Sequence, residues 1–225
     1  MKLPPFLAGT LLVLGLLMPL ALHAQPSEQQ RLVDRARVVV DDFRGDPNFR
    51  HVAVYVQNAY GVVVVPNLVE GGFIIGGRYG VGVLLARDPQ TGAWSDPVFV
   101  TLAGATVGLQ IGGKASDMLI TIMNEAAVNK LLEQGLKLGA DASAAVGPVG
   151  GSIGAGTTVN FGEDVYVFSR NVGLFAGLTL DGTAIVPKSD WNTAYYGRKV
   201  RPKEIIAGKV ANPAAAPLRE ALAAF

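Results

Sequence analysis

The fold of this 225-residue chain is decided by Gly61–Leu85, which reads GVVVVPNLVEGGFIIGGRYGVGVLL. Short runs of valine, isoleucine and leucine alternate here with single or paired glycines. β-Branched residues favour strands, whereas glycines among them mark bulges, tight bends or close approaches of two backbones. The pattern continues along the chain, and 23 of the 28 glycines lie between Gly61 and Gly182. The sequence therefore predicts a glycine-rich β-sheet over the middle of the chain.

Ten short strands are expected in this region. They are Val62–Val65, Phe73–Ile75, Val81–Leu85, Val98–Leu102, Val107–Ile111, Met118–Met123, Thr157–Asn160, Val165–Ser169, Leu174–Leu180 and Thr183–Val186. Short strands at regular spacing, separated by turn residues, are typical of an antiparallel sheet, sandwich or barrel. One helix is expected to interrupt the series, between Asn124, which can cap it, and Gly135, which can end it.

A helix is predicted over Ser27–Phe43, ahead of the sheet. Its apolar residues recur at one-and-four spacing and form one stripe, and Ser27 with Gln30 is a possible capping box. Gly45 and Pro47 are expected to end it. The stripe can lie in a membrane interface or dock on the protein's own core. Docking is favoured, because Ser27–Asp46 carries four arginines against five acidic residues.

Two further segments flank the sheet. Asn48–Asn58 is ambiguous, since its valines alternate as in a strand while Pro47 suits a first helical turn; helix is favoured. Asn212 and Pro213 are expected to open a short final helix. The predicted fold class is α+β, with a glycine-rich antiparallel β-sheet or barrel-like core braced by N- and C-terminal helices.

Residues 1–24 have the layout of a cleavable secretory signal peptide. Lys2 supplies a positive charge, Phe6–Leu17 is a mostly apolar run, and Ala24 is a small residue before Gln25. The alternative is an uncleaved membrane anchor, but the run is shorter than the ~20 residues that span a bilayer. We expect a signal peptide at residues 1–24, a single domain at residues 25–225, and a secreted or periplasmic location.

The composition excludes several classes of function. The chain has 19 basic and 18 acidic side chains, two histidines and no cysteine. Removal of residues 1–24 leaves 18 of each charge and one histidine, His51. A neutral total argues against a nucleic-acid-binding protein, and one histidine without cysteine excludes the usual zinc ligand sets. No metal site and no cofactor are predicted.

Two motifs resemble catalytic loops without the residues that the chemistry needs. Gly150–Gly154 matches G-x-S-x-G around Ser152, but a nucleophilic serine needs a histidine base placed after it, and His51 precedes it. Gly108–Ala115 nearly matches a phosphate-binding loop, but Ala115 stands where a hydroxyl must reach Mg²⁺. Both are interpreted as turn and strand segments, so the chain is not expected to be an enzyme and no catalytic residue is assigned.

Two groups of residues are candidates for binding lipid head groups. The first is a basic cluster of Arg198, Lys199, Arg201 and Lys203, four cations within six residues. Each cation is worth ~1 kcal/mol near an anionic surface. The alternative is an ordinary solvated loop. The second group lies on the first helix and consists of Arg31, Arg35, Arg37 and Phe43.

Several ordered motifs point to a known family. They are Gly61–Pro66, Glu70–Val83, Trp94–Phe99, Gly108–Gly112, Leu138–Ala142, Gly147–Gly150, Gly173–Gly177 and Tyr195–Gly197. Together they resemble the SYLF domain, also known as the yeast actin-regulator (Las17-binding) domain, from about Leu32 to the C-terminus.

The resemblance implies a lipid-binding module without enzymatic activity. Eukaryotic members bind phosphoinositides and, in yeast, actin, often with a basic amphipathic N-terminal segment; here that segment is not net basic. Bacterial members are secreted or periplasmic, where actin is absent and phosphoinositides are scarce. For such a member the expected partner is an anionic phospholipid such as phosphatidylglycerol or cardiolipin, with neither actin nor nucleic acid. The alternative is a structural or protein-interaction module of the periplasm without direct lipid contact.

Overall fold

The structure, a computed structural model, describes residues 25–148, 161–170 and 182–225, with the backbone alone for 72–75 and 106–114. The helices are α1 Glu28–Gly45, α2 Val52–Asn58, α3 Glu125–Gln134, α4 Ser189–Tyr196, α5 Pro202–Ile206 and α6 Ala216–Ala223, with 3-10 turns η1 Pro47–Phe49 and η2 Pro213–Ala215. The strands are β1 Gly61–Ala86, β2 Val98–Ile122, β3 Leu136–Lys137, β4 Ala144–Val146, β5 Val165–Arg170 and β6 Thr183–Pro187. The expected α+β class is confirmed.

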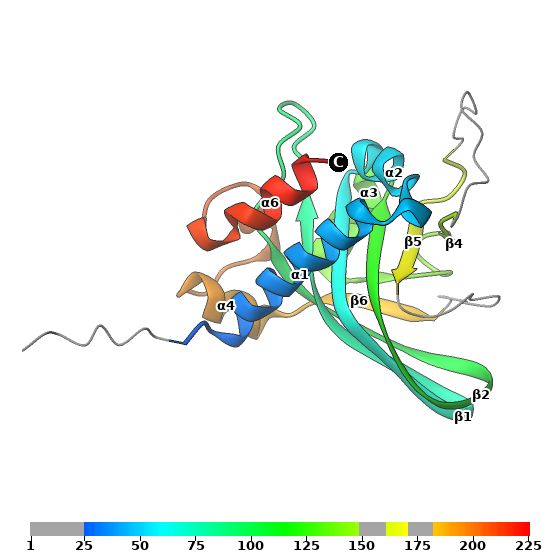
Figure 1. Ribbon diagram of the computed structural model, residues 1–225. Helices are drawn as coiled ribbons and strands as arrows, with labels where there is room; N and C mark the ends of the chain where they lie inside the picture. Colours follow the sequence, from blue (N-terminus) through cyan, green and yellow to red (C-terminus); the bar gives the residue numbers. More distant parts are fainter. Residues whose placement is uncertain (1–24, 149–160, 171–181) are drawn as a thin grey trace, which may run out of the picture.

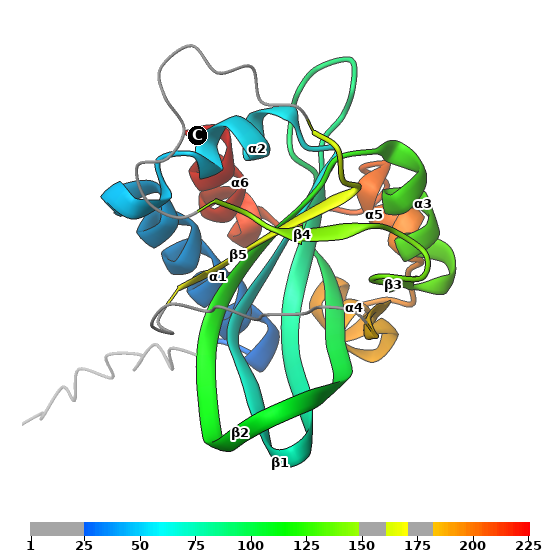
Figure 2. The same ribbon diagram turned by 90° about the vertical axis from the view of Figure 1, so that its right-hand side faces the viewer.

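A long ribbon of two antiparallel strands, β1 and β2, organises the molecule. It bends sharply near the middle of both strands, so that its two halves return toward each other (Figures 1 and 2). The free edge of β2 pairs with β6 in one half and with β5 in the other. Strands β3 and β4 extend these two halves. The sheet is antiparallel as predicted, except that β4 runs parallel to β5.

The strands are longer than the sequence pattern predicts. The three short strands expected between Val62 and Leu85 are one continuous strand, and so are the three expected between Val98 and Met123. The intervening glycines bend the backbone without breaking its pairing; the register shifts only between Val65 and Leu68 and between Gly72 and Ile74. The expected strands Thr157–Asn160 and Leu174–Leu180 lie outside the described residues.

The close approach of the two halves of β1 explains the glycines at positions 80 and 82. A Cβ built on Gly82 would lie 2.4 Å from the main-chain oxygen of Val64, in the other half of the same strand. One on Gly80 would lie 2.8 Å from a Val65 methyl group. The register shift beside this crossing is made by Pro66 and Asn67, and Asn67 takes a φ of 63°. The prediction of close approach at strand glycines is thus confirmed.

A buried ion pair spans the bend. The Arg78 Nε and Glu70 Oε1 atoms are 3.2 Å apart, and both side chains are 4% exposed. Arg78 also donates a hydrogen bond to Thr183 Oγ1 of β6, at 3.3 Å. Burial lowers the pKa of Arg78, and the neighbouring Glu70 opposes that shift. Two residues that flank the bend in sequence are thereby held together inside the folded ribbon.

Each face of the ribbon packs against different helices. Val62 and Val64 belong to a cluster with α1, α2 and α6, whereas Val63 and Val65 belong to a second cluster with α3 and α5. This alternation is the period-two pattern of a strand buried on both faces. Figure 2 shows α1 and α6 on one side of the ribbon and α3 and α5 on the other.

The flanking helices confirm most of the local predictions. The side chain of Ser27 accepts a hydrogen bond from the Gln30 main-chain amide at the start of α1. The reciprocal half of the capping box is absent, because the Gln30 side chain instead donates to Asp34 and to the Ala214 carbonyl. The segment at Asn48–Asn58 is helical, and Asn124 caps α3 as expected.

Helix α4 is held to the sheet by a buried asparagine. Asn192 is fully buried, accepts a hydrogen bond from the Phe99 amide at 2.8 Å, and donates to the Phe99 carbonyl at 3.3 Å. Its side chain thus occupies the place of a neighbouring strand at the beginning of β2. The aromatic rings of Trp191 and Tyr195 pack on Phe99 from the same helix. This anchor positions the segment that follows α4.

Candidate functional site

The basic cluster lies on the connection between α4 and α5. Helix α4 ends at Gly197, whose φ of 68° is the left-handed conformation that favours glycine. Val200 is buried and fixes the loop, and Pro202 begins α5. The side chains of Arg198, Lys199, Arg201 and Lys203 are all exposed. The structure therefore brings all four predicted cations together at the surface.

Acidic neighbours compensate half of the cluster. Lys203 pairs with Glu133 of α3, and the Arg201 Nε lies 3.5 Å from Glu204 Oε2. Within the described part of the chain, Arg198 and Lys199 form no ion pair; Arg198 donates only to the Lys209 carbonyl, at 3.4 Å. Exposed pairs contribute little, so an incoming anion can replace them at small cost.

The Glu204 carboxylate is part of the local structure. It accepts a hydrogen bond from the Arg201 amide at 2.9 Å and so caps the first turn of α5. This main-chain hydrogen bond, together with the Arg201 side chain, lowers the pKa of Glu204. The carboxylate therefore stays ionised, and the cluster keeps a fixed negative charge beside Arg201.

Sequence reasoning missed one cation and one acid of this surface. Lys209 is exposed beside Arg198, and Glu133 reaches Lys203 from a different helix. Glu133 and Lys203 are seventy positions apart in the chain. Pairing over that distance has no local sequence signal, whereas Lys209 lies only six positions beyond Lys203 and could have been included by a wider window.

The arginines of α1 form the second candidate surface. Arg31 and Arg35 are exposed, while Arg37 pairs with Asp41 at 2.6 Å. Asp41 also pairs with Arg44, at 2.9 Å. Arg31 and Arg35 are therefore the more available cations of this helix.

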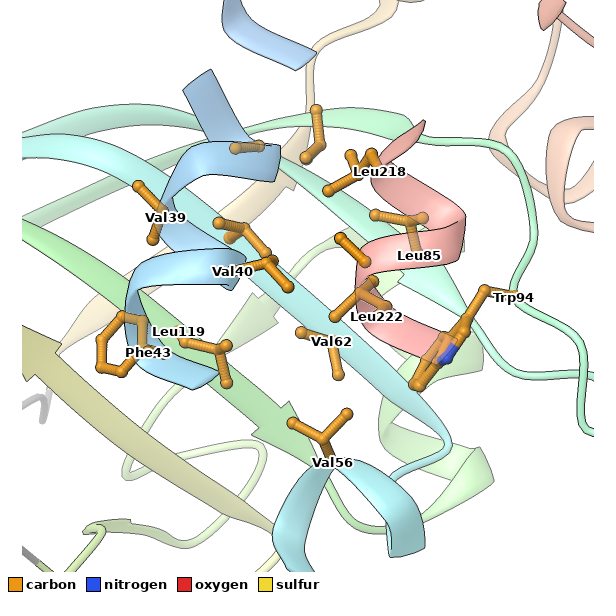
Figure 3. Close-up of a cluster of buried hydrophobic side chains, with 14 of the residues drawn as sticks. Val39, Val40, Phe43, Val56, Val62, Leu85, Trp94, Leu119, Leu218 and Leu222 are labelled. Carbon is orange, nitrogen blue, oxygen red and sulfur yellow. The ribbon is translucent and has the colours of Figure 1, made fainter. Parts of the chain in front are cut away.

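Phe43 is not part of that surface. Its side chain is fully buried, and its ring meets Phe49 edge-on at 4.8 Å. It lies on the helical stripe with Val39 and Val40, which faces the ribbon and α6 (Figure 3). The preference for docking on the protein's own core is confirmed. Because the helix has one apolar side and the sheet covers it, Phe43 cannot belong to a membrane-facing group.

The two candidate surfaces are linked through α4. The Tyr195 hydroxyl donates a hydrogen bond to the Gln30 side chain of α1 at 3.1 Å. Gln30 directly precedes Arg31, and Tyr195 lies three residues before Arg198. Figure 1 shows the first turns of α1 beside α4. Burial raises the pKa of Tyr195 well above its ordinary value, with Asp96 and Asp34 adding to that shift. The hydroxyl therefore stays protonated.

Two of the hollows that border α5 also adjoin α3. One, of about 380 Å³, is lined by the β1–β2 turn, α3 and the segment after α5. Its arginines already have partners: Arg219 lies 3.1 Å from Asp96, and Arg87 stacks over Trp94 at 5.6 Å. The other is an open groove of about 740 Å³ between α3 and α5. The groove carries Arg201, Lys203 and Lys209 of the cationic surface.

The described residues hold no arrangement that suggests a metal site. Over 25–148, 161–170 and 182–225 there is no group of three metal-ligating side chains. His51 is half-buried at the start of α2, and Ser152 lies outside the described residues. In the same ranges no helix is long and apolar enough to cross a membrane.

Comparison with known proteins identifies the family. A family model described as "Ysc84: Las17-binding protein actin regulator" matches residues 103–225, more than half of the chain. The SH3 domain-containing YSC84-like protein 1 of Xenopus laevis is 34% identical over 160 residues, covering 70% of this chain and 47% of that protein. Protein YSC84 of Saccharomyces cerevisiae is 34% identical over 164 residues, covering 72% of this chain and 35% of that protein.

The LAS seventeen-binding protein 3 of Saccharomyces cerevisiae is 32% identical over 163 residues, covering 71% of this chain and 35% of that protein. The chain therefore spans half or less of the length of these relatives. The match to the family model begins within β2 and includes the C-terminal helices, with the basic cluster between α4 and α5. The chain belongs to the Ysc84 family of SYLF domains.

Proposed function

We propose that this chain is a non-enzymatic module that attaches peripherally to anionic phospholipid surfaces. The observation that carries the proposal is the exposure of Arg198 and Lys199 without ion-pair partners among the described residues, beside Arg201 and Lys203. Cations presented together at a surface attract phosphate head groups at ~1 kcal/mol each. Arg31, Arg35 and Arg37 of α1 supply a second, weaker contact, since the acids of that helix offset their charge.

The names of the relatives support a second candidate function. One is named a LAS seventeen-binding protein, and the matching family model is described as an actin regulator. A protein-interaction module of the cell envelope without lipid contact is therefore the alternative. The two candidates differ in salt dependence, because screening weakens contacts between exposed charges much more than apolar interfaces.

Vesicle flotation tests the proposed function directly. The processed protein is mixed with phosphatidylcholine vesicles, or with vesicles that also contain phosphatidylglycerol or cardiolipin. We expect it to float with the anionic vesicles at about 0.1 M salt and to be released at about 1 M, where the Debye length falls from about 10 Å to about 3 Å. Equal binding to neutral vesicles, or binding that resists salt, would contradict head-group attachment and favour the alternative.

We also propose that residues 1–24 direct export and are removed. The layout of a single cation, a short apolar run and Ala24 supports this. The mass of the protein recovered from the envelope fraction of an expressing bacterium is expected to correspond to a chain beginning at Gln25. Recovery of the full-length mass from the membrane would instead indicate an uncleaved anchor.

A further inference from the structure

The groove between α3 and α5 combines apolar lining residues with a charged rim. The apolar residues are Leu132 of α3, which is buried, Pro202 and Ile206 of α5, which are half-buried, and Ala207, which is exposed. The groove volume of about 740 Å³ is within the range of small-molecule sites. Figure 2 shows the two helices lying side by side at the edge of the molecule. Contact with apolar residues gives no binding free energy to a hydrated inorganic anion, whereas it stabilises a bound hydrocarbon chain.

The rim is suited to one phosphate group. Arg201, Lys203 and Lys209 line the groove together with the acids Glu133 and Glu204, so the rim carries an excess of positive charge. The Arg201 side chain is 80% exposed despite its contact with Glu204. A guanidinium in that position can donate two parallel hydrogen bonds to phosphate oxygens.

Glu133 competes with an incoming anion for one cation of this rim. It holds Lys203 across the groove, with both side chains about half exposed, at 50% and 51%. A phosphate must take Lys203 away from Glu133, and it then lies close to an uncompensated carboxylate. Glu204 is committed to capping α5, so Glu133 is the acid whose charge opposes binding without contributing to the local backbone.

From these features we infer that the groove seats a single anionic phospholipid, with its phosphate at Arg201, Lys203 and Lys209 and its first acyl methylenes on Leu132, Ile206 and Ala207. The inference rests on the proposed function and narrows it from attachment to a charged surface to recognition of one lipid molecule. Glu133 lowers the affinity of this site for the lipid, because it competes with the phosphate for Lys203. Arg198 and Lys199 lie outside the groove lining and serve the bilayer surface.

Titration calorimetry with dihexanoyl phosphatidylglycerol, kept below its micellar concentration, measures lipid binding to the groove in the absence of a bilayer. The processed wild-type protein is expected to bind one molecule. Ala207→Trp places a large ring over the groove at an exposed position, and we expect roughly a tenfold or greater loss of affinity for the monomeric lipid. Flotation with anionic vesicles is expected to remain, because Arg198 and Lys199 are untouched.

Glu133→Gln is the second variant and works in the opposite direction. Freeing Lys203 is expected to raise affinity for the monomeric lipid about threefold. Glu125→Gln is its matched control, since Glu125 is exposed on the same helix but does not line the groove. We expect the control to bind as the wild type does.

Three results would contradict the inference that the groove binds a single phospholipid. They are no binding of monomeric lipid by the wild type, an affinity unchanged by both Ala207→Trp and Glu133→Gln, and binding of glycerol phosphate as tight as that of the lipid. Wild-type flotation with anionic vesicles alongside any of these would leave the proposed function standing. If salt-sensitive flotation is absent but the monomeric lipid still binds, surface attachment is rejected and the lipid-binding site in the groove stands.

Discussion

Replacing Gly82 by alanine is expected to destabilise the protein by about 3 kcal/mol, at the upper end of the cost of overpacking. The new methyl group would lie 2.4 Å from the Val64 carbonyl oxygen, which belongs to a paired strand and cannot rotate away. The two halves of β1 would have to separate, and both packed clusters border that crossing. Urea unfolding followed by far-UV circular dichroism measures the effect.

A graded set of alanine variants isolates this cause. The Gly80 methyl group would first meet methyl groups of Val65 and Leu68, at 2.8 and 2.9 Å, and the nearest backbone atom, Leu68 Cα, would lie 3.3 Å away, so we expect a smaller loss. Gly77→Ala is the control in the same strand, because its methyl group would lie 3.8 Å from the Gly104 oxygen. The control is expected to stay within about 0.5 kcal/mol of the wild type. Equal stability of all three variants would show that the halves of β1 do not approach as described.

Reversing the charge of Arg198, Lys199, Arg201 and Lys203 with glutamate is expected to abolish binding to anionic vesicles. Loss of four cations at ~1 kcal/mol each removes about 4 kcal/mol, close to a thousandfold in affinity, and the added negative charges repel the surface further. Flotation and vesicle titration at low salt measure the loss. Thermal unfolding checks that the α4–α5 connection still folds without the Arg201–Glu204 contact.

A smaller pair of variants separates local recognition from net charge. Arg198→Glu with Lys199→Glu is compared with Arg50→Glu and Lys137→Glu, which change the net charge equally at exposed positions elsewhere. We expect about a thirtyfold loss for the first pair, from two cations, and a much smaller loss for the second. Similar losses in both pairs would mean that overall charge, rather than this surface, drives binding.

Local patterns predicted the helices well, because each rests on interactions within a few residues. The apolar stripe of α1 identified its buried side, and Phe43, which we grouped with the candidate lipid-binding residues of this helix, lies buried on that stripe. Asn124 and Gly135 bounded α3 for equally local reasons: a side chain that accepts an amide hydrogen bond and a φ of 85°.

The sheet was harder to predict because glycine has two meanings in a strand. At Gly92 a φ of 72° makes a turn, whereas Gly80 and Gly82 continue the strand and permit another backbone to cross it. Sequence alone does not separate these roles, so two long strands were predicted as six short ones. The strands β3 and β4 are too short to show any alternation, and they depend on β6 and β5 for pairing.

The candidate site was predictable as a list of cations but not as a balance of charges. Four basic residues within six positions are visible in any reading of the sequence. Whether each one is available depends on Glu133, which α3 places against Lys203, and on Glu204, which α5 needs as a cap. Those placements follow from how the two helices pack on the sheet.

The folded ribbon also bears on how quickly this protein can reach its native state. Its strand pairs begin with Leu84 and Val98, fourteen positions apart, and end with Gly61 and Ile122, sixty-one positions apart. Closing the widest loop directly costs roughly 1.3 kcal/mol more conformational entropy than closing the narrowest. Pairing can instead start at the turn, where Arg87 bridges to Trp94, and proceed one rung at a time. Although most pairs of this sheet join residues far apart in the chain, its folding can thus begin with a pair of residues that are close in sequence. The two halves of β1 meet at Gly82 only after pairing has extended beyond the bend.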